Sequence, residues 1–218
     1  MTETVLTYLD SYCERAGAVG LFAEPLNLLT NVLFLVAAGV ALRALKQAPV
    51  QGRRLDLWLL VGLLASIGVG SGLWHAQPNG ATLLMDVVPI TLFINLYIVA
   101  ALRRLFGLGW WKVGGFWALY FGVGMWAQTH LPPELLNGTI MYIPTYGALV
   151  VLTLALLRHA PGQGRAFAVA LLVWSASLAL RTLDRDICPD LGIGAHFLWH
   201  TLNAWVLWRL LMVLIRGR

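Results

Sequence analysis

Residues 83–102 read LLMDVVPITLFINLYIVAAL, a run in which Asp86 is the single charged residue. About twenty predominantly apolar residues are what an α-helix needs to cross the roughly 30 Å apolar core of a bilayer. Comparable runs recur along the whole chain, so this stretch is not one anchor attached to a soluble domain. The composition agrees, because 59% of the 218 residues are hydrophobic and 11% are charged, whereas soluble domains carry about 25% charged residues.

The pattern predicts an all-α integral membrane protein, a bundle of seven transmembrane helices that forms a single domain over residues 1–218. Turn-forming residues separate the runs, as at Gln77-Pro78-Asn79-Gly80 and Pro161-Gly162. The first 25 residues are acidic and lack the basic start and apolar core of a signal peptide, so we expect them to remain as an outer amino-terminal segment. The predicted spans are Leu26–Leu45, Leu55–Trp74, Leu83–Leu102, Trp110–Gln128, Leu136–Leu157, Ala166–Leu183 and Ala195–Ile215.

Basic residues predict the orientation, because short loops rich in lysine and arginine stay on the cytoplasmic side. Of the 15 basic residues, only Arg15, Arg181 and Arg185 fall near the predicted outer ends of the spans. The amino terminus is therefore expected outside and the carboxyl terminus inside, and the net charge of +5 reports topology. Nucleic-acid binding is the rival interpretation, but the basic residues are dispersed over four separate inner segments and form no single patch.

Polar residues gather at the outer ends of three predicted spans. Ser71 and His75 lie four residues apart at the end of the second span, Asp86 lies near the start of the third, and His196 and His200 lie four apart at the start of the seventh. Ionisable groups inside spans are costly and usually face the bundle interior or a cavity. Residues four apart share one helix face, so three imidazoles from two helices can bind one ion and leave a position open, as in catalytic zinc sites.

The polar residues beside the three histidines suit two catalytic roles at a zinc site. Asp86 is the candidate general base, which accepts a proton from the water that zinc activates and returns it to the leaving nitrogen. Ser71 is the candidate hydrogen-bond donor to the oxyanion. The structural alternative for Ser71 is helix packing, because Gly68, Gly70 and Gly72 surround it.

These residues resemble the alkaline ceramidase family, within a superfamily of seven-helix membrane hydrolases that includes the adiponectin receptors. The similarity lies in Gly70-Ser71-Gly72-Leu73-Trp74-His75, in Asp86 and in His196-Phe197-Leu198-Trp199-His200. It implies a zinc amidohydrolase that cleaves ceramide, with zinc on the three histidines, Asp86 as proton acceptor and Ser71 as stabiliser of the tetrahedral intermediate. Val87 stands where eukaryotic members carry a second acidic residue, and the short loops favour a bacterial inner-membrane protein with its zinc site towards the periplasm. The substrate is then ceramide or another N-acyl lipid.

The resemblance also implies features of the outer segment. Eukaryotic members bind calcium through acidic residues there, for which the matches are Glu14, Glu24 and, displaced by one residue, Asp10. Ala16 replaces an expected asparagine ligand, so a solvated acidic segment is the alternative. Cys13 and Cys188 are both predicted on the outer side, where oxidising compartments permit disulfides, and the resemblance implies that they pair. Two free thiols are the alternative.

Three rival functions differ in what they require. A receptor or sensor of the same superfamily keeps the zinc site and turns over little or no substrate. Retinal binding is disfavoured, because its Schiff base needs an intramembrane lysine and Lys46 and Lys112 lie at the predicted inner face. Haem transport could use paired histidines, but the adjacent serine and aspartate favour hydrolysis.

Overall fold

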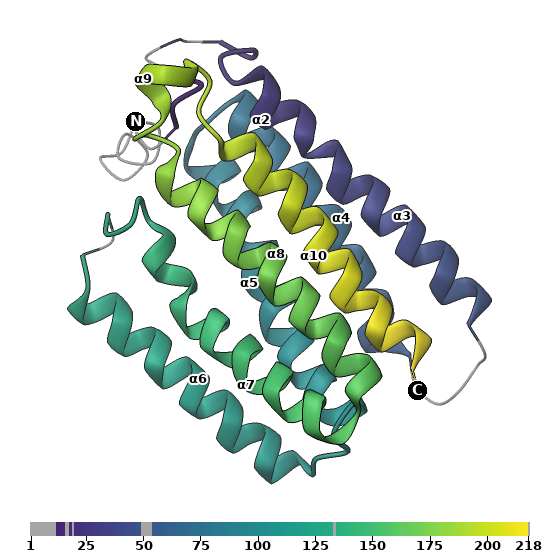
Figure 1. The fold of residues 1–218 in the computed structure, drawn as a ribbon. Coiled ribbons are helices and arrows are strands. Elements are labelled where there is room, and N and C mark those ends of the chain that lie inside the picture. Colours follow the sequence, from purple (N-terminus) through teal and green to yellow (C-terminus); the bar gives the residue numbers. More distant parts are fainter. Residues whose placement is uncertain (1–11, 16–17, 19, 49–53, 133, 218) are drawn as a thin grey trace.

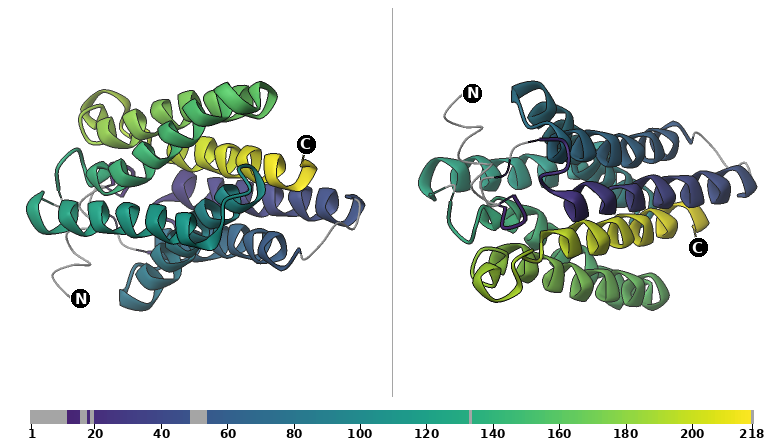
Figure 2. Two further views of the ribbon diagram at one scale, coloured as in Figure 1. Left: turned by 90° about the horizontal axis from the view of Figure 1, so that it is seen from below. Right: turned by 90° about the horizontal axis from the view of Figure 1, so that it is seen from above.

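A computed structural model describes residues 12–15, 18, 20–48, 54–132 and 134–217 of the chain. Every regular element in these ranges is a helix, and the long helices run side by side along one direction (Figures 1 and 2). The elements are α2 (Pro25–Thr30), α3 (Val32–Gln47), α4 (Leu55–Ala76), α5 (Gly80–Arg104), α6 (Trp110–His130), the 3-10 helix η1 (Thr139–Tyr142), α7 (Ile143–His159), α8 (Pro161–Leu183), α9 (Cys188–Leu191) and α10 (His196–Arg216).

Within the described residues, six helical segments are long and apolar enough to cross a membrane. They comprise α2 with α3, α4, α5, η1 with α7, α8, and α10. The chain thus has the helices of a multi-pass membrane protein. The fourth predicted span corresponds to α6, whose 21 residues give a length of about 30 Å. Its hydropathy is lower than that of the six segments, because tryptophan, tyrosine and glycine, together with Lys112 and His130, make up much of it.

The helix ends follow local chemistry that refines the predicted boundaries. The first span is interrupted at Asn31, between α2 and α3. The fifth begins later than predicted, at Thr139, because Leu136, Asn137 and Gly138 have positive φ angles of 56°, 52° and 75°, which no helix accommodates. Pro161 begins α8 at a position where a helix does not need its missing N–H.

Helix α10 is the central element of the bundle. It packs against α8 on one side and against α3 on the other, with α4 also in contact (Figure 1). Its side chains Val206, Leu211 and Leu214 belong to the apolar core. Helix α6 instead lies at the edge of the bundle, beside α7 (Figure 1).

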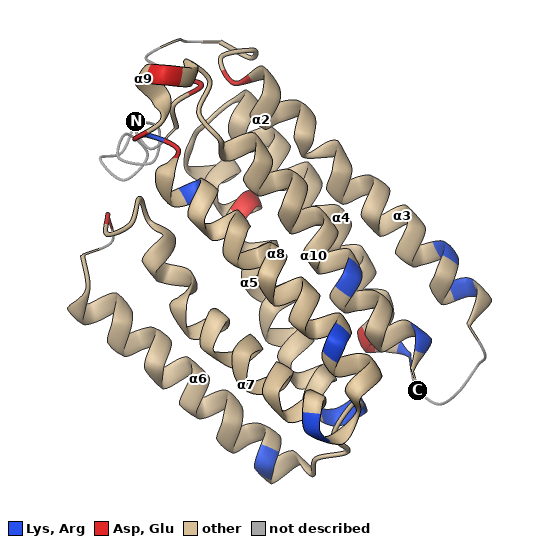
Figure 3. Ribbon diagram, viewed as in Figure 1, with Lys and Arg blue, Asp and Glu red and all other residues tan. Residues whose placement is uncertain are grey.

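Charge separates along the bundle. Lysines and arginines gather at the end where α3 and α10 finish, and acidic residues gather mainly at the opposite end, near α2 and α9 (Figure 3). Asp56 is an exception, because it lies among the basic residues and binds Arg104 through both carboxylate oxygens. We call these the basic end and the acidic end of the bundle.

Candidate metal centre

Three buried histidines meet near the acidic end. His75 lies in the last turn of α4, and His196 and His200 lie in the first turns of α10; their exposed fractions are 1%, 3% and 3%. One ligand nitrogen from each lies within 4.8 Å of the other two. The ring centroids are 4.7 to 5.4 Å apart. The structure therefore brings together all three predicted metal ligands, and this group could hold a metal ion.

Two of these imidazoles have one nitrogen engaged by another side chain. The Nδ1 atom of His75 lies 2.5 Å from Oε2 of Glu24, and the Nδ1 atom of His200 lies 3.1 Å from the hydroxyl of Thr30. A partner on one ring nitrogen sets the tautomer and orientation of a metal-binding histidine and leaves the other nitrogen for the metal. Both partners come from the α2 region, so this short helix orients ligands that belong to α4 and α10.

An arginine completes the set of contacts behind His75. Nε of Arg15 donates to Oε1 of Glu24 at 2.5 Å, and Nη2 of Arg15 donates to the backbone carbonyl of His75 at 3.1 Å. Burial alone would raise the pKa of Glu24, but hydrogen bonds with His75 and Asn27 and the charge of Arg15 lower this pKa below its ordinary value. Glu24 therefore stays a carboxylate where a free glutamate would begin to take up a proton.

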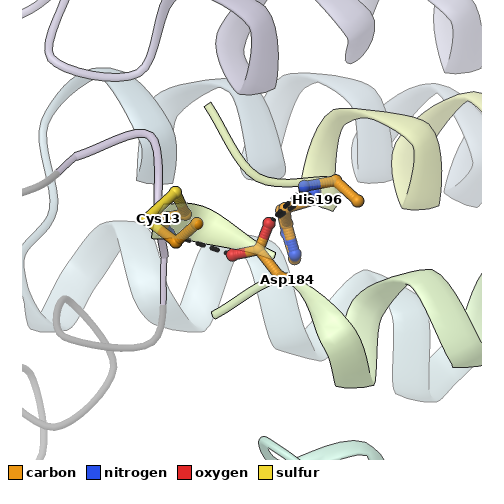
Figure 4. Close-up of a disulfide and its surroundings, with 5 residues drawn as sticks. Cys13, Asp184 and His196 are labelled. Atoms are coloured by element: carbon orange, nitrogen blue, oxygen red, sulfur yellow. Dashed lines mark hydrogen bonds between the residues drawn. A yellow bond between two sulfur atoms is a disulfide. The ribbon is translucent and has the colours of Figure 1, made fainter. Parts of the chain in front are cut away.

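A buried aspartate fixes the start of α10. The carboxylate of Asp184 accepts hydrogen bonds from the backbone N–H groups of Ala195 and His196, at 2.6 and 2.8 Å, and from that of Cys13, at 2.9 Å (Figure 4). Cys13 is also joined to Cys188 by a disulfide, which confirms the predicted pairing. Asp184 and the disulfide together hold the amino-terminal segment against the end of α10 that carries the histidines.

Tyr12 is thereby placed over the metal centre. Its ring meets those of His75 and His196 edge-on, with centroids 4.9 and 4.5 Å away, and its hydroxyl accepts a hydrogen bond from the indole of Trp74. Burial raises the pKa of Tyr12 above its usual range, and the positive charge of Arg181 offsets part of this rise. Tyr12 is therefore a neutral phenol that covers the histidines.

Ser71 and Asp86 face each other where α4 and α5 are in closest contact. A Cβ added at Gly70 would come within 1.8 Å of the carbonyl oxygen of Met85 and 3.1 Å of the nitrogen of Asp86. This approach puts Ser71 beside the Asp86 carboxylate. Glycine thus serves helix packing at the position before Ser71, while Ser71 itself lines the same cavity as Asp86 and the three histidines.

The cavity below the histidines has a volume of about 1400 Å³. It lies between α4, α5, α6, α7, α8 and α10. Apolar side chains such as Ile94, Leu149, Leu152 and Leu210 line much of it. Typical sites for small ligands measure about 300 to 1000 Å³, so this cavity has room for a long-chain lipid.

The donor set fits a zinc ion. Three imidazoles that each offer one nitrogen are the ligands of zinc sites that keep a fourth position open. Oδ1 of Asp86 is buried and has no hydrogen-bond partner among the described residues. An unpartnered buried carboxylate oxygen is costly, and a zinc ligand such as water beside the histidines would supply a partner.

The predicted calcium ligands have protein partners where they are described. The Glu14 carboxylate accepts the backbone N–H groups of Leu26 and Asn27, at 2.7 and 2.8 Å, at the start of α2. Both oxygens of Glu24 are engaged by Arg15, Asn27 and His75. Asp10 lies outside the described residues. Calcium binding stays a prediction.

Several residues of the centre were missed by sequence reasoning. Glu24 and Thr30 orient metal ligands, Asp184 fixes the first turn of α10, and Arg15 holds Glu24. A weak signal exists for Glu24 and Asp184, since Glu24 directly precedes an apolar segment and Asp184 directly follows one. Nothing in the sequence pairs Glu24 with His75, because their contact depends on how α2 packs against α4.

The sequence was compared with protein-family models and with curated proteins. No protein-family model matches the chain, and no curated protein matches it. A function is therefore inferred from the three-histidine group, the unpartnered Oδ1 atom of Asp86 and the lipid-sized cavity.

Proposed function

We propose that this protein is a membrane amidohydrolase of the alkaline ceramidase type, which uses zinc to cleave ceramide or a related N-acyl lipid into a fatty acid and an amine. One observation carries the proposal. The buried cluster of His75, His196 and His200 opens on the same cavity as the Asp86 carboxylate, and that cavity is large and mostly apolar beyond them. A metal site with only a structural role needs neither a carboxylate with an unpartnered buried oxygen nor the cavity.

His75, His196 and His200 would hold the zinc. When bound, zinc polarises a carbonyl and lowers the pKa of water towards neutrality. Asp86, fixed on α5 opposite the histidines, takes the proton from the attacking water and delivers it to the nitrogen that leaves. Ser71 donates a hydrogen bond to the oxygen on which negative charge develops. Tyr12 covers the centre and limits access of water from the acidic end.

We place the chain in a bacterial inner membrane with seven spans, its amino terminus in the periplasm and its carboxyl terminus in the cytoplasm. The gathering of basic residues at one end of the bundle supports this orientation (Figure 3). The length of α6 and its place beside α7 support a seventh span. The metal centre would then lie near the periplasmic face, where the disulfide between Cys13 and Cys188 can form.

Release of fatty acid by purified protein tests the activity. The parent, loaded with zinc, should release fatty acid from at least one member of a panel containing ceramide and N-acyl amines. Asp86→Asn should retain fold and zinc and lose about 10²- to 10⁴-fold in turnover, the usual contribution of a general base. Ser71→Ala should lose about 10- to 10³-fold, as for one oxyanion donor.

The same assay separates the hydrolase from a receptor or sensor. A parent protein that holds zinc and hydrolyses no lipid amide would favour the receptor. Full turnover in both variants would contradict the roles given to Asp86 and Ser71. Loss of zinc in Asp86→Asn would make this aspartate a structural partner of the site.

A further inference from the structure

A second charged group faces the metal centre across the cavity. Arg181 lies in the last turn of α8 and lines the same cavity as the three histidines. Its guanidinium carbon lies 5.4 Å from the ring centroid of Trp199 and 5.9 Å from that of Tyr142. Trp199 stands directly before His200 on α10, and Arg181 lies near enough to Asp86 and His196 for its charge to act on both.

The Arg181 side chain is oriented without being neutralised. Aromatic rings take up the faces of its guanidinium, while the hydrogen-bonding N–H groups point outward in its plane. Nε is buried and has no hydrogen-bond partner among the described residues. In the described part of the chain no carboxylate lies within ion-pair distance of Arg181. The arginine therefore presents a preorganised edge that suits a planar anion with two oxygens.

We propose that Arg181 binds an anionic oxygen group of the lipid amine, so that the substrates are N-acyl lipids with a carboxylate close to the amide, as in N-acyl amino acids. This proposal rests on the proposed function and names the substrate class of the same site. Proximity selects the carboxylate: Arg181 shares the cavity with the histidines and its charge acts on Asp86 and His196, so a carboxylate within a few bonds of the reacting amide would reach it. A phosphate on the amine offers similar chemistry several bonds further from the amide.

The two ends of such a substrate would bind in different parts of the cavity. The acyl chain enters the apolar part of the cavity, near Leu149 and Leu210, and the charged amine part remains at the polar end, with Arg181. Glu134 and Asp186 also line this end and are exposed.

A matched pair of substrates tests the proposal. N-oleoylglycine and N-oleoylethanolamine share the acyl chain and the amide, and differ in a carboxylate against a hydroxymethyl group. The parent should have a kcat/KM about 10- to 100-fold higher on N-oleoylglycine, the value of a hydrogen-bonded charge pair shielded from water. An N-oleoyl phosphatidylethanolamine arm distinguishes phosphate from carboxylate, and preference for it would overturn the carboxylate assignment.

Variants of Arg181 test whether this residue causes the preference for N-oleoylglycine. Arg181→Gln should remove it, mainly by raising KM for N-oleoylglycine, and should leave kcat/KM on N-oleoylethanolamine within about threefold. Arg165→Gln is the matched control, because Arg165 is exposed on the same helix, outside the cavity, and the charge change is equal. It should keep the preference of the parent. Arg181→Lys keeps the charge but loses the planar fork, and should retain only part of the preference.

Each outcome decides one question. Equal kcat/KM of the parent on the matched pair overturns the anion site, whether or not any variant folds. An equal loss on both substrates in Arg181→Gln also overturns it, since the arginine would then act on the reacting centre. If the parent hydrolyses no amide, the proposed function fails instead. Calorimetric binding of the two lipids to the parent and to Arg181→Gln then still tests the anion site.

Discussion

At the scale of single residues, the centre depends on which ring nitrogen of His75 and His200 is hydrogen-bonded to another side chain and which is left for a metal. Glu24 and Thr30 engage Nδ1 of His75 and His200, so the other nitrogen of each ring is left for the proposed zinc ion. Such partners raise the basicity of the ligand and fix the ring. Arg15 forms an ion pair with Glu24 and holds it in place.

Glu24→Gln tests this arrangement. Removing the charge behind His75 should weaken zinc affinity by about 10- to 100-fold, the usual effect of losing a partner of this kind. Competition with a fluorescent chelator measures it. Glu14→Gln is the matched control, because Glu14 lies in the same segment and bonds only to the start of α2 in the described structure. An unchanged affinity in Glu24→Gln would show that its contact with His75 has no effect on the metal.

The three histidines, Ser71 and Asp86 could be predicted because their positions follow from helix periodicity and a shared membrane depth. Glu24, Thr30 and Asp184 could not, because their contacts join segments far apart in the sequence. Glu24 and His75 are 51 residues apart, and Thr30 and His200 are 170 apart. Sequence spacing carries no information on such pairs until the helices are packed.

At the scale of elements, the closest helix contact in the site is between α4 and α5 at Gly70. A side chain there would overlap the backbone of Met85. The close approach is what sets Ser71 beside Asp86. Gly68 makes a similar contact with Asn31 and Phe34, so α4 is held closely on two sides.

Gly70→Ala should therefore separate α4 from α5. We expect a loss of stability of about 1–3 kcal/mol, as for overpacked cores, together with reduced hydrolysis, because Ser71 and Asp86 move apart. Gly62→Ala on the same helix is the control, since nothing lies within 4 Å of its added Cβ. Thermal unfolding and turnover of the two variants give the comparison. Equal behaviour would mean that the contact at Gly70 does not set the site geometry.

The disulfide links elements that lie 175 residues apart. Replacing Cys13 and Cys188 by serine should destabilise the protein by about 2–4 kcal/mol. It should also speed exchange of zinc, since Tyr12 is no longer held over the histidines. Thermal unfolding and zinc release, measured with and without reductant for the parent, check both effects. A parent that is insensitive to reductant would contradict the role given to this bond.

Sequence reasoning found the long helices because apolar length is a strong signal, and it missed details that depend on single backbone angles. The start at Thr139 follows from three consecutive residues with positive φ, a conformation that Gly138 and Asn137 tolerate and Leu136 does not favour. The interruption at Asn31 likewise has no periodic signature. The seventh span stays a prediction, because α6 has the length of a span and a weaker apolar character.

At the scale of the whole molecule, the number of spans determines where the two ends lie. Seven spans place the termini on opposite sides of the membrane, and six place them on the same side. Paired reporters at the two ends separate these outcomes. We expect a fluorescent protein at the carboxyl end to fluoresce, as in the cytoplasm, and alkaline phosphatase at the amino end, exported by an added leader, to be active. Active alkaline phosphatase at the carboxyl end would contradict the orientation.

The proposed function of the whole bundle depends on His75, His196 and His200 holding a zinc ion. Anomalous scattering collected on either side of the zinc absorption edge, from crystals of protein purified without chelators, tests it most directly. We expect a single strong peak between the three histidines that disappears below the edge. No peak there, or a peak bound by other residues, would contradict it.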